Sequence, residues 1–270
     1  MLSHEMLPAS AGDIGQMARQ LRLTLIAEQA ETMLAAAQEA KMTGRELLAF
    51  MFSKELERRK MNRSVMGIHS AHFPFERTLE SFDFSVIPSI DPGRIRDLKR
   101  LDWVRRGANL LLQGPPGVGK THLAIGFGRE AIAQDFKVLF VSAEDLVYEL
   151  VAASHAGQLR ERVAAYAKPA VLIIDELGYL PLGADAAHVL FSLISARYER
   201  KSTVITCNRA ISEWGMMLGD STTAMALLDR FLHHSEVLTI SGDSYRLLEK
   251  KREGLLAGAI SAKAEEVRKG

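Results

Sequence analysis

A glycine-rich segment at residues 114–121 follows the pattern G-x-x-x-x-G-K-[ST] and stands between an apolar run and a predicted helix. Glycines let such a loop turn tightly and approach a phosphate, to which the loop amides and the helix N-terminus donate. Lys120 is expected to reach the β- and γ-phosphates, and the Thr121 hydroxyl to ligate Mg²⁺. For His122, packing at the helix start is an equal alternative to nucleotide contact. The predicted nucleotide contacts are Gly114, Pro115, Pro116, Gly117, Val118, Gly119, Lys120, Thr121 and His122.

Two carboxylates follow the apolar run at residues 171–174. We expect Asp175 to hold Mg²⁺, directly or through water, and Glu176 to orient and polarise an attacking water. A glutamate at this place favours hydrolysis, because a kinase that must keep water from its phosphate has no need of such a base. A chance pair of acidic residues at a strand end is the competing interpretation, and the phosphate loop earlier in the chain disfavours it.

Asn208 and two arginines are further candidates. Asn208 ends the run 203–207, where it could position the same water or simply stop a strand. Arg230 and Arg246 could each neutralise charge that develops on the γ-phosphate, or could form a surface ion pair. The residues alone leave these alternatives open.

A parallel sheet is the scaffold that the sequence predicts for these residues. Helical stretches separate the first four of five short apolar or β-branched runs, which is typical of β-α units with helices on both faces. Ligands of such sheets bind at the carboxyl ends of the strands, where Asp175 and Asn208 are expected. The predicted fold class is α/β with a parallel five-stranded sheet, whose strands are expected at 109–113, 138–141, 171–174, 203–207 and 237–240.

A small helical module and an irregular connection are predicted before this sheet. Residues 13–62 are mostly helical by their pattern, and Thr43 with Glu46 predicts a capping box at one helix start. Residues 65–92 are expected to form an apolar strap that docks on a neighbouring domain or subunit, and residues 92–106 a helix. The predicted domains are a helical module for DNA or partner contact at 1–66, an α/β domain at 67–250 and a charged tail at 251–270.

Composition excludes several classes of protein. The 270 residues carry 34 basic and 33 acidic side chains, so no global charge attracts nucleic acid. The single cysteine excludes a disulfide framework and a multi-cysteine zinc site, and we expect His233 and His234 to be a packed or surface pair rather than metal ligands. Without a secretory signal pattern or an apolar run near the roughly 20 residues of a membrane span, a cytoplasmic protein with no membrane partner is expected.

Contact with DNA must therefore come from local clusters of basic residues. A solvated helix face is the simpler interpretation of such a cluster, and a surface that neutralises DNA phosphates is the alternative. The sequence shows no helix-turn-helix or zinc-finger pattern, which agrees with binding that ignores base sequence. The candidate DNA contacts are Lys54, Arg58, Arg59, Lys60, Arg63, Lys99, Arg100, Arg105 and Arg106.

Several segments beyond the phosphate loop resemble one family. The chain resembles the AAA+ ATPases and, within them, the IstB-like transposition helpers, which are similar to DnaC-type helicase loaders. The likeness covers roughly residues 15–250, and the GYLPL, RYER and DRFLHH segments are more specific than the phosphate loop. The matching segments are 71–74, 78–84, 119–124, 173–179, 197–200, 228–234 and 242–246.

The resemblance implies an AAA+ P-loop ATPase that uses ATP and Mg²⁺. It implies a homo-oligomeric helper, encoded beside a transposase in a bacterial insertion element, that binds double-stranded DNA with little sequence specificity and recruits or activates the transposase. It implies that Asn208 is the sensor-1 residue, that Arg230 is an arginine finger reaching a neighbour's ATP, and that Arg246 is a sensor-2-like arginine touching the nucleotide. The last two roles could be exchanged. Cys207 departs from the pattern, since a serine is expected there.

Three other functions remain open at this point. A replicative helicase loader would share the ATPase core but prefer single-stranded DNA and a hexameric helicase. A P-loop kinase is disfavoured by Glu176 and by the absence of an obvious arginine-rich lid in the sequence. A nucleotide-switched adaptor that hydrolyses nothing would keep its function after Glu176→Gln.

Overall fold

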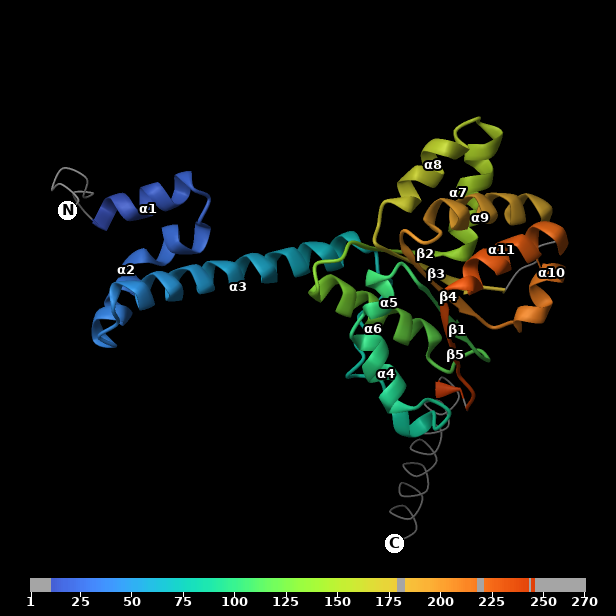
Figure 1. The fold of residues 1–270 in the computed structure, drawn as a ribbon, viewed down its shortest axis with the longest axis horizontal. Helices are drawn as coiled ribbons and strands as arrows, with labels where there is room; N and C mark the ends of the chain where they lie inside the picture. The colour runs from blue at the N-terminus through green and yellow to red at the C-terminus, as the bar shows by residue number, and fades with distance from the viewer. Residues whose placement is uncertain (1–10, 179–182, 218–220, 243, 246–270) are drawn as a thin grey trace, which may run out of the picture. The chain divides into compact units, whose positions relative to one another are not determined.

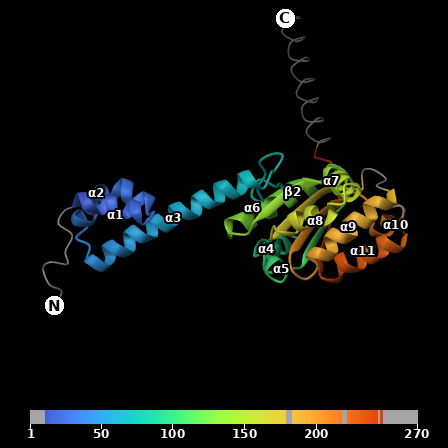
Figure 2. The same cartoon turned by 90° about the horizontal axis from the view of Figure 1, so that it is seen from above.

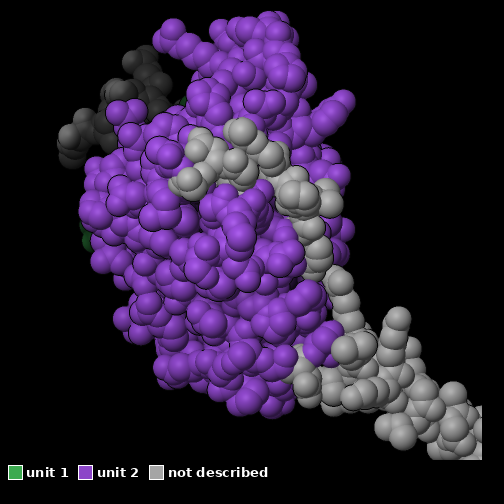
Figure 3. Space-filling model, turned by 90° about the vertical axis from the view of Figure 1, so that its right-hand side faces the viewer, with its two compact units in different colours: residues 1–66 green, residues 67–270 purple. Residues whose placement is uncertain are grey.

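The computed structural model describes residues 11–178, 183–217, 221–242 and 244–245. Arg246, most of the GYLPL segment and the tail at 251–270 lie outside these residues. The chain forms two compact units, residues 1–66 and 67–270, here called unit 1 and unit 2 and coloured separately in Figure 3. Within the described residues, no helix combines the length and the apolar character needed to cross a bilayer.

Unit 1 is helical, as predicted. Its core is formed by Ala18, Ile26, Met33 and Met51 from the three helices. The buried Glu55 carboxylate accepts hydrogen bonds from the first amides of the second helix, which have no partner within that helix. The helices are α1 (Ala11–Gln20), α2 (Thr24–Glu39) and α3 (Gly44–Ser70).

The start of α3 follows the sequence prediction, and its end does not. The Thr43 amide donates to Glu46 Oε2 at 2.7 Å, and the Glu46 amide donates to Thr43 Oγ1 at 3.4 Å, which confirms the capping box. The prediction that the strap begins at residue 65 is wrong, because α3 continues to Ser70. Gly67 permits this, since a Cβ there would lie 2.7 Å from Ile132 Cγ2 of the neighbouring helix.

The strap after α3 is itself part of unit 2 and packs into the core of that unit. Leu79, Phe82, Ile87 and Ile90 are all buried in the core of this unit, around a short 3-10 helix η2 (Phe84–Val86). The single helix predicted for 92–106 is instead two, because Leu101 takes a left-handed φ of 62° between them. These are α4 (Pro92–Lys99) and α5 (Asp102–Arg105).

A five-stranded parallel sheet forms the centre of unit 2 and confirms the predicted fold class (Figure 1). Its order is β2-β3-β4-β1-β5, so the strand that precedes the glycine-rich loop pairs with β4 on one side and β5 on the other. The strands are β1 (Asn109–Gln113), β2 (Val138–Ser142), β3 (Val171–Leu177), β4 (Ser202–Cys207) and β5 (Ser235–Thr239).

Helices cover both faces of the sheet (Figure 2). Leu110 and Leu112 of β1 enter one core with α4, α5 and α6, whereas Leu111 enters the other core with α7 to α11. This alternation is the two-residue period of a strand between two buried layers. The remaining helices are α6 (Lys120–Ala133), α7 (Ala143–His155), α8 (Leu159–Ala167), α9 (Gly183–Arg197), η3 (Ile211–Glu213), α10 (Trp214–Met217) and α11 (Ser221–His233).

Candidate functional site

The glycine-rich loop joins the end of β1 to the start of α6. Gly117 and Gly119 have φ angles of 82° and 89°, in the left-handed region that favours glycine. A Cβ on Gly119 would lie 2.6 Å from the Phe82 ring, and one on Gly117 would lie 2.1 Å from Ser244 Oγ. No side chain caps the N-terminus of α6, so its first amides are available to an anion. The loop therefore has the backbone and the surroundings of a phosphate cradle.

Lys120 lies over this loop. Its Nζ donates to the carbonyl oxygens of Gly114 and Pro115, both at 2.8 Å, and the residue is largely buried. The ammonium is thus held by the same segment whose amides would meet a phosphate. This is the position from which a lysine can reach the outer phosphates of a nucleotide.

Asp175 meets two hydroxyl groups at the carboxyl edge of the sheet. Thr121 Oγ1 lies 2.9 and 3.0 Å from its two carboxylate oxygens, and Thr206 Oγ1 donates to Oδ1 at 2.6 Å. Burial raises the pKa of Asp175, while the hydroxyl groups and the charge of Lys120 oppose that rise. Thr121 and Asp175 together offer the hard oxygen donors that suit Mg²⁺.

The backbone at Glu176 departs from the regular geometry of strand β3. Its φ is 63°, a left-handed conformation that costs energy for a residue with a side chain. Its amide donates to Thr206 Oγ1 at 2.8 Å, and the pairing of β3 with β4 shifts register between Ile174 and Leu177. The Glu176 side chain is exposed next to the buried Asp175. The two adjacent carboxylates therefore have different environments, one suited to a metal and the other to water.

Asn208 follows β4 beside the loop. The Gly114 amide donates to the Cys207 carbonyl at 3.1 Å, which fixes the end of β4 against the start of the loop. Asn208 Oδ1 is buried, and no described residue forms a hydrogen bond with it. A buried acceptor of this kind is costly unless a ligand or water donates to it. Contact of Asn208 with a nucleotide stays a prediction.

His122 faces the strap. Its Nε2 lies 2.8 Å from the Thr78 carbonyl oxygen and 3.1 Å from Ser81 Oγ, and its ring meets the Phe82 ring edge-on. Burial lowers the pKa of His122. In this arrangement the imidazole joins the strap to the first turn of α6. Contact with a nucleotide stays a prediction.

The two arginines are placed differently. Arg230 lies on α11, where its guanidinium stacks over the Phe191 ring of α9 at 4.4 Å and donates to Ser195 Oγ. It therefore contacts its own helix pair rather than the glycine-rich loop. Arg246 is outside the described residues, but the Tyr245 amide before it donates to the Gly117 carbonyl at 3.0 Å.

Most candidate DNA contacts are ion-paired within the chain. Arg58 pairs with Glu28 at 2.5 Å, and Arg59 pairs with Glu55 at 3.0 Å. A cation already paired with a carboxylate has less to gain from a DNA phosphate, so these residues are weaker candidates than their charge suggests. Lys60, Arg63 and Arg100 are exposed. The paired candidates also include Lys54 with Glu57, Lys99 with Glu80 and Glu130, Arg105 with Asp102, and Arg106 with Glu236.

Sequence reasoning missed Thr206. This buried hydroxyl joins Asp175 to the Glu176 amide, and it comes from a different strand. The signal in the sequence is a threonine two places before Asn208, in a run that also begins with a threonine, Thr203. The partners of Thr206 depend on the order of the strands in the sheet, and no local sequence pattern indicates that order.

Comparisons with known proteins identify a family. The family described as IstB-like ATP binding protein matches residues 16–253. A relative from Geobacillus stearothermophilus, named for insertion sequence IS5376 and ATP binding, is 41% identical over 88% of this chain and 95% of its own. One from Pseudomonas aeruginosa, named for insertion sequence IS21 and ATP binding, is 39% identical over 87% and 89%.

Solved structures share the fold over about two thirds of this chain. A crystal structure of DnaI, 23% identical, has a TM-score of 0.50 and covers 63% of this chain and 90% of its own. The replication initiator DnaA bound to AMPPCP and single-stranded DNA, 21% identical, also has a TM-score of 0.50, over 67% and 56%. These likenesses support the AAA+ fold and nothing finer. The match of the family over most of the sequence shows more: this chain belongs to the IstB-like ATP binding proteins.

Proposed function

We propose that this protein hydrolyses ATP with Mg²⁺ in a homo-oligomer on DNA, as the helper ATPase of an insertion-sequence transposition system. The observation that carries the proposal is the contact of Thr121 with Asp175 beside the glycine-rich loop, next to an outward-turned Glu176 and with Asn208 following the neighbouring strand. Nucleotide binding without hydrolysis would need only the glycine-rich loop and a metal ligand. The exposed glutamate and the unsatisfied amide oxygen supply what hydrolysis adds, which is a way to hold and activate water.

Each residue has a role that its position supports. Lys120 and the amides of the loop bind the phosphates, and Thr121 with Asp175 holds Mg²⁺. The metal supplies positive charge beside the oxygens of the phosphates. Glu176 accepts a proton from the attacking water, and Asn208 Oδ1 accepts a hydrogen bond from its other hydrogen. The water oxygen forms a bond to the γ-phosphorus while the bond between that phosphorus and the β–γ bridging oxygen breaks, and the products are ADP and phosphate.

Arg230 is proposed to act on the ATP of a neighbouring subunit. Its stacking on Phe191 supports this, because the arginine is held on the surface of α9 and away from the loop of its own chain. An arginine supplied by a neighbour makes turnover depend on assembly, since the developing charge on the γ-phosphate is neutralised only at a subunit contact. Arg246 is proposed to touch the nucleotide within the chain, and the two roles could be exchanged.

The partners are proposed from the family. Relatives named for insertion sequences support a role in transposition, for which the cognate transposase is the partner. Double-stranded DNA, bound with little sequence preference, is the surface on which the oligomer forms. The alternative function is that of a helicase loader, which would use the same ATPase core with single-stranded DNA.

The test is binding to random-sequence DNA, measured by fluorescence anisotropy at moderate salt. Duplex and single-stranded probes of one length are each titrated with the full-length protein, with and without ATP and Mg²⁺. We expect tight binding to the duplex only when ATP is present, and loss of that binding in Lys120→Ala. A preference for single strands would move the assignment to the helicase loader, and binding that ignores ATP would contradict the coupling between the two ligands.

A further inference from the structure

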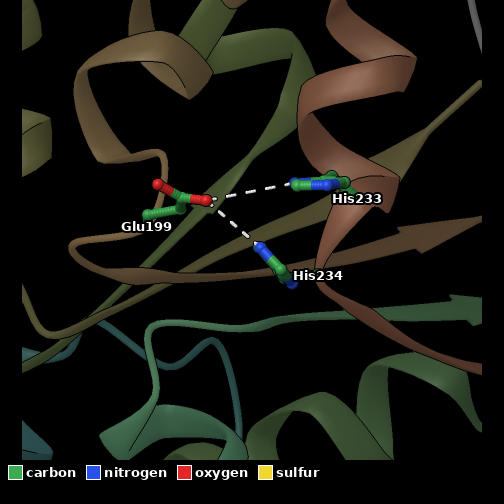
Figure 4. Close-up of side chains that lie close together, drawn as sticks. All are labelled: Glu199, His233 and His234. Atoms are coloured by element: carbon green, nitrogen blue, oxygen red, sulfur yellow. Dashed lines mark hydrogen bonds and ion pairs between the residues drawn. The ribbon is translucent and has the colours of Figure 1, made fainter.

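Two histidines and a glutamate from distant parts of unit 2 lie side by side (Figure 4). Glu199 Oε1 is 3.2 Å from His234 Nε2 and 4.0 Å from His233 Nδ1. One donor atom from each of the three residues lies within 4.8 Å of the others. The sequence favoured a simple histidine pair because no cysteine lies near residues 233 and 234 and two other histidines, His69 and His72, belong to a distant segment.

The backbone of each residue is fixed by the fold. His233 is the last residue of α11, and the carbonyl of His234 accepts a hydrogen bond from the Asn109 amide at the start of β1. Glu199 lies in the turn after α9 with a left-handed φ of 55°, and the next amide, of Arg200, donates to the Arg197 carbonyl. The cluster therefore brings together three side chains whose main chains are already positioned, which lowers the entropy cost of binding an ion.

The cluster is separate from the nucleotide site. It lies at the amino ends of β1, β4 and β5, whereas the glycine-rich loop, Asp175 and Asn208 lie at the carboxyl ends of the strands. A five-residue strand such as β1 separates the two edges by roughly 15 Å. No side chain is shared, so a ligand of the cluster is not the Mg²⁺ that accompanies ATP.

The donor set selects a class of ion. Two imidazoles and one carboxylate suit zinc and its neighbours among the divalent transition metals, whereas Mg²⁺ and Ca²⁺ prefer oxygen ligands. Bonds of about 2.1 Å around a tetrahedral ion place the donors roughly 3.4 Å apart. The observed separations bracket that value, so small side-chain rotations suffice. We propose that Glu199, His233 and His234 form a binding site for a divalent transition-metal ion such as Zn²⁺.

Two neighbouring features bear on this site. The Tyr198 hydroxyl lies 2.6 Å from His233 Nδ1, so it can orient this ring and must yield or share that nitrogen when the metal binds. The three side chains are each slightly more than half exposed, at 53–55%, which leaves an open path and room for water as a further ligand. The bound ion would join the end of α9 to the end of α11.

Zinc binding to untagged, chelator-stripped full-length protein tests the proposal by isothermal titration calorimetry. We expect one saturable Zn²⁺ site per chain without nucleotide. Glu199→Gln, His233→Ala and His234→Ala should each weaken it more than about tenfold, because losing one of three direct ligands costs more than losing an outer-shell partner. His155→Ala removes an exposed imidazole from the end of α7, outside the cluster, and is the matched control that should bind normally.

A second measurement does not depend on substituted proteins. Co²⁺ replaces Zn²⁺ at such sites and, when four-coordinate, absorbs visible light much more strongly than hydrated Co²⁺ does in water. We expect a saturable visible spectrum from the wild-type protein that added Zn²⁺ abolishes. Wild-type protein that gives neither saturable Zn²⁺ binding nor this spectrum overturns the proposal. Binding that survives His234→Ala, or that is lost in His155→Ala, places the metal elsewhere and overturns it equally.

Discussion

The Thr206 hydroxyl connects the two carboxylates of the candidate site. It donates to Asp175 Oδ1 at 2.6 Å and accepts from the Glu176 amide at 2.8 Å, and it is fully buried. The first bond orients the residue proposed to hold Mg²⁺. The second holds the strained backbone of the residue proposed to activate water. Thr206 is therefore a positioning residue, which acts on the reaction only through its neighbours.

Thr206→Val tests this role, because valine keeps the shape and removes both hydrogen bonds. We expect kcat for ATP hydrolysis to fall about 10- to 100-fold, the range typical when a partner of a metal ligand is lost. The KM for ATP should change little, since the glycine-rich loop and Lys120 remain intact. Steady-state ATPase assays measure both constants, and Thr206→Ser should restore much of the rate. A variant with unchanged kcat would show that the hydroxyl positions nothing that matters to turnover.

Functional residues that lie in one continuous segment can be predicted from the sequence. The glycine-rich loop and the Asp175–Glu176 pair are each a single segment, and their residue types indicate their chemistry. Thr206 could not be found in this way, because its partners depend on strand β4 lying beside β3. The contact of Glu199 with His233 and His234 depends in the same way on the turn after α9 meeting the end of α11.

Arg197 joins three elements around the start of β4. It is almost completely buried, and its guanidinium donates to the carbonyls of Tyr166, Pro169 and Ser202 and to Thr203 Oγ1. All four acceptors are neutral, and burial lowers the pKa of Arg197 to about 9, so the group stays charged at neutral pH. The arginine that begins the RYER segment thus holds α8, α9 and β4 together, far from any nucleotide.

Arg197→Leu should destabilise unit 2. The substitution leaves buried carbonyl oxygens without donors, which costs roughly 3 kcal/mol or more in the free energy of unfolding. Urea denaturation followed by tryptophan fluorescence measures this, because both tryptophans, Trp103 and Trp214, are buried in unit 2. Arg200→Leu, at an exposed position of the same segment, is the control and should change stability by less than about 0.5 kcal/mol. Equal effects of the two substitutions would contradict the structural role of Arg197.

At the element scale, strands were easier to predict than the ends of helices. All five strands lie where short apolar runs predicted them. A strand that is buried on both faces consists mostly of apolar or β-branched residues, and this composition is easy to recognise. The helix predicted for 92–106 breaks at Leu101, which has a left-handed φ. A leucine in the sequence does not indicate such a conformation. The end of helix α3, at Gly67 in unit 2, lies close to Ile132, and such a contact between segments far apart in the sequence has no local signal.

The whole molecule places its proposed catalytic groups in two sets. Lys120, Thr121, Asp175 and Asn208 lie around one edge of the sheet, and Arg230 is held on α9 by Phe191 and Ser195. The described contacts of Arg230 are with α9, so we propose that this arginine completes the site of a second copy. Assembly would then control turnover.

Mixing two inactive variants tests this arrangement. Arg230→Ala should bind ATP normally and lose turnover, whereas Glu176→Gln should bind ATP, assemble on DNA and keep its arginine but lack the base. When the two are mixed on DNA, each Arg230→Ala subunit beside a Glu176→Gln subunit has an intact base and a neighbour's arginine, so ATPase activity should reappear. A mixture as inactive as either variant alone would show that Arg230 does not act between subunits.

The behaviour of Glu176→Gln tests the proposed hydrolysis mechanism most directly, because glutamine keeps the size of the side chain and removes the base. ATP binding and ATP turnover are measured on the same preparation, with Mg²⁺ and duplex DNA present. We predict that the variant binds ATP as the wild type does and turns it over at least about 100-fold more slowly, the usual contribution of a positioned general base. The variant should also stay assembled on DNA with ATP bound. Turnover at the wild-type rate would contradict the assignment of Glu176, and with it the mechanism built on this site.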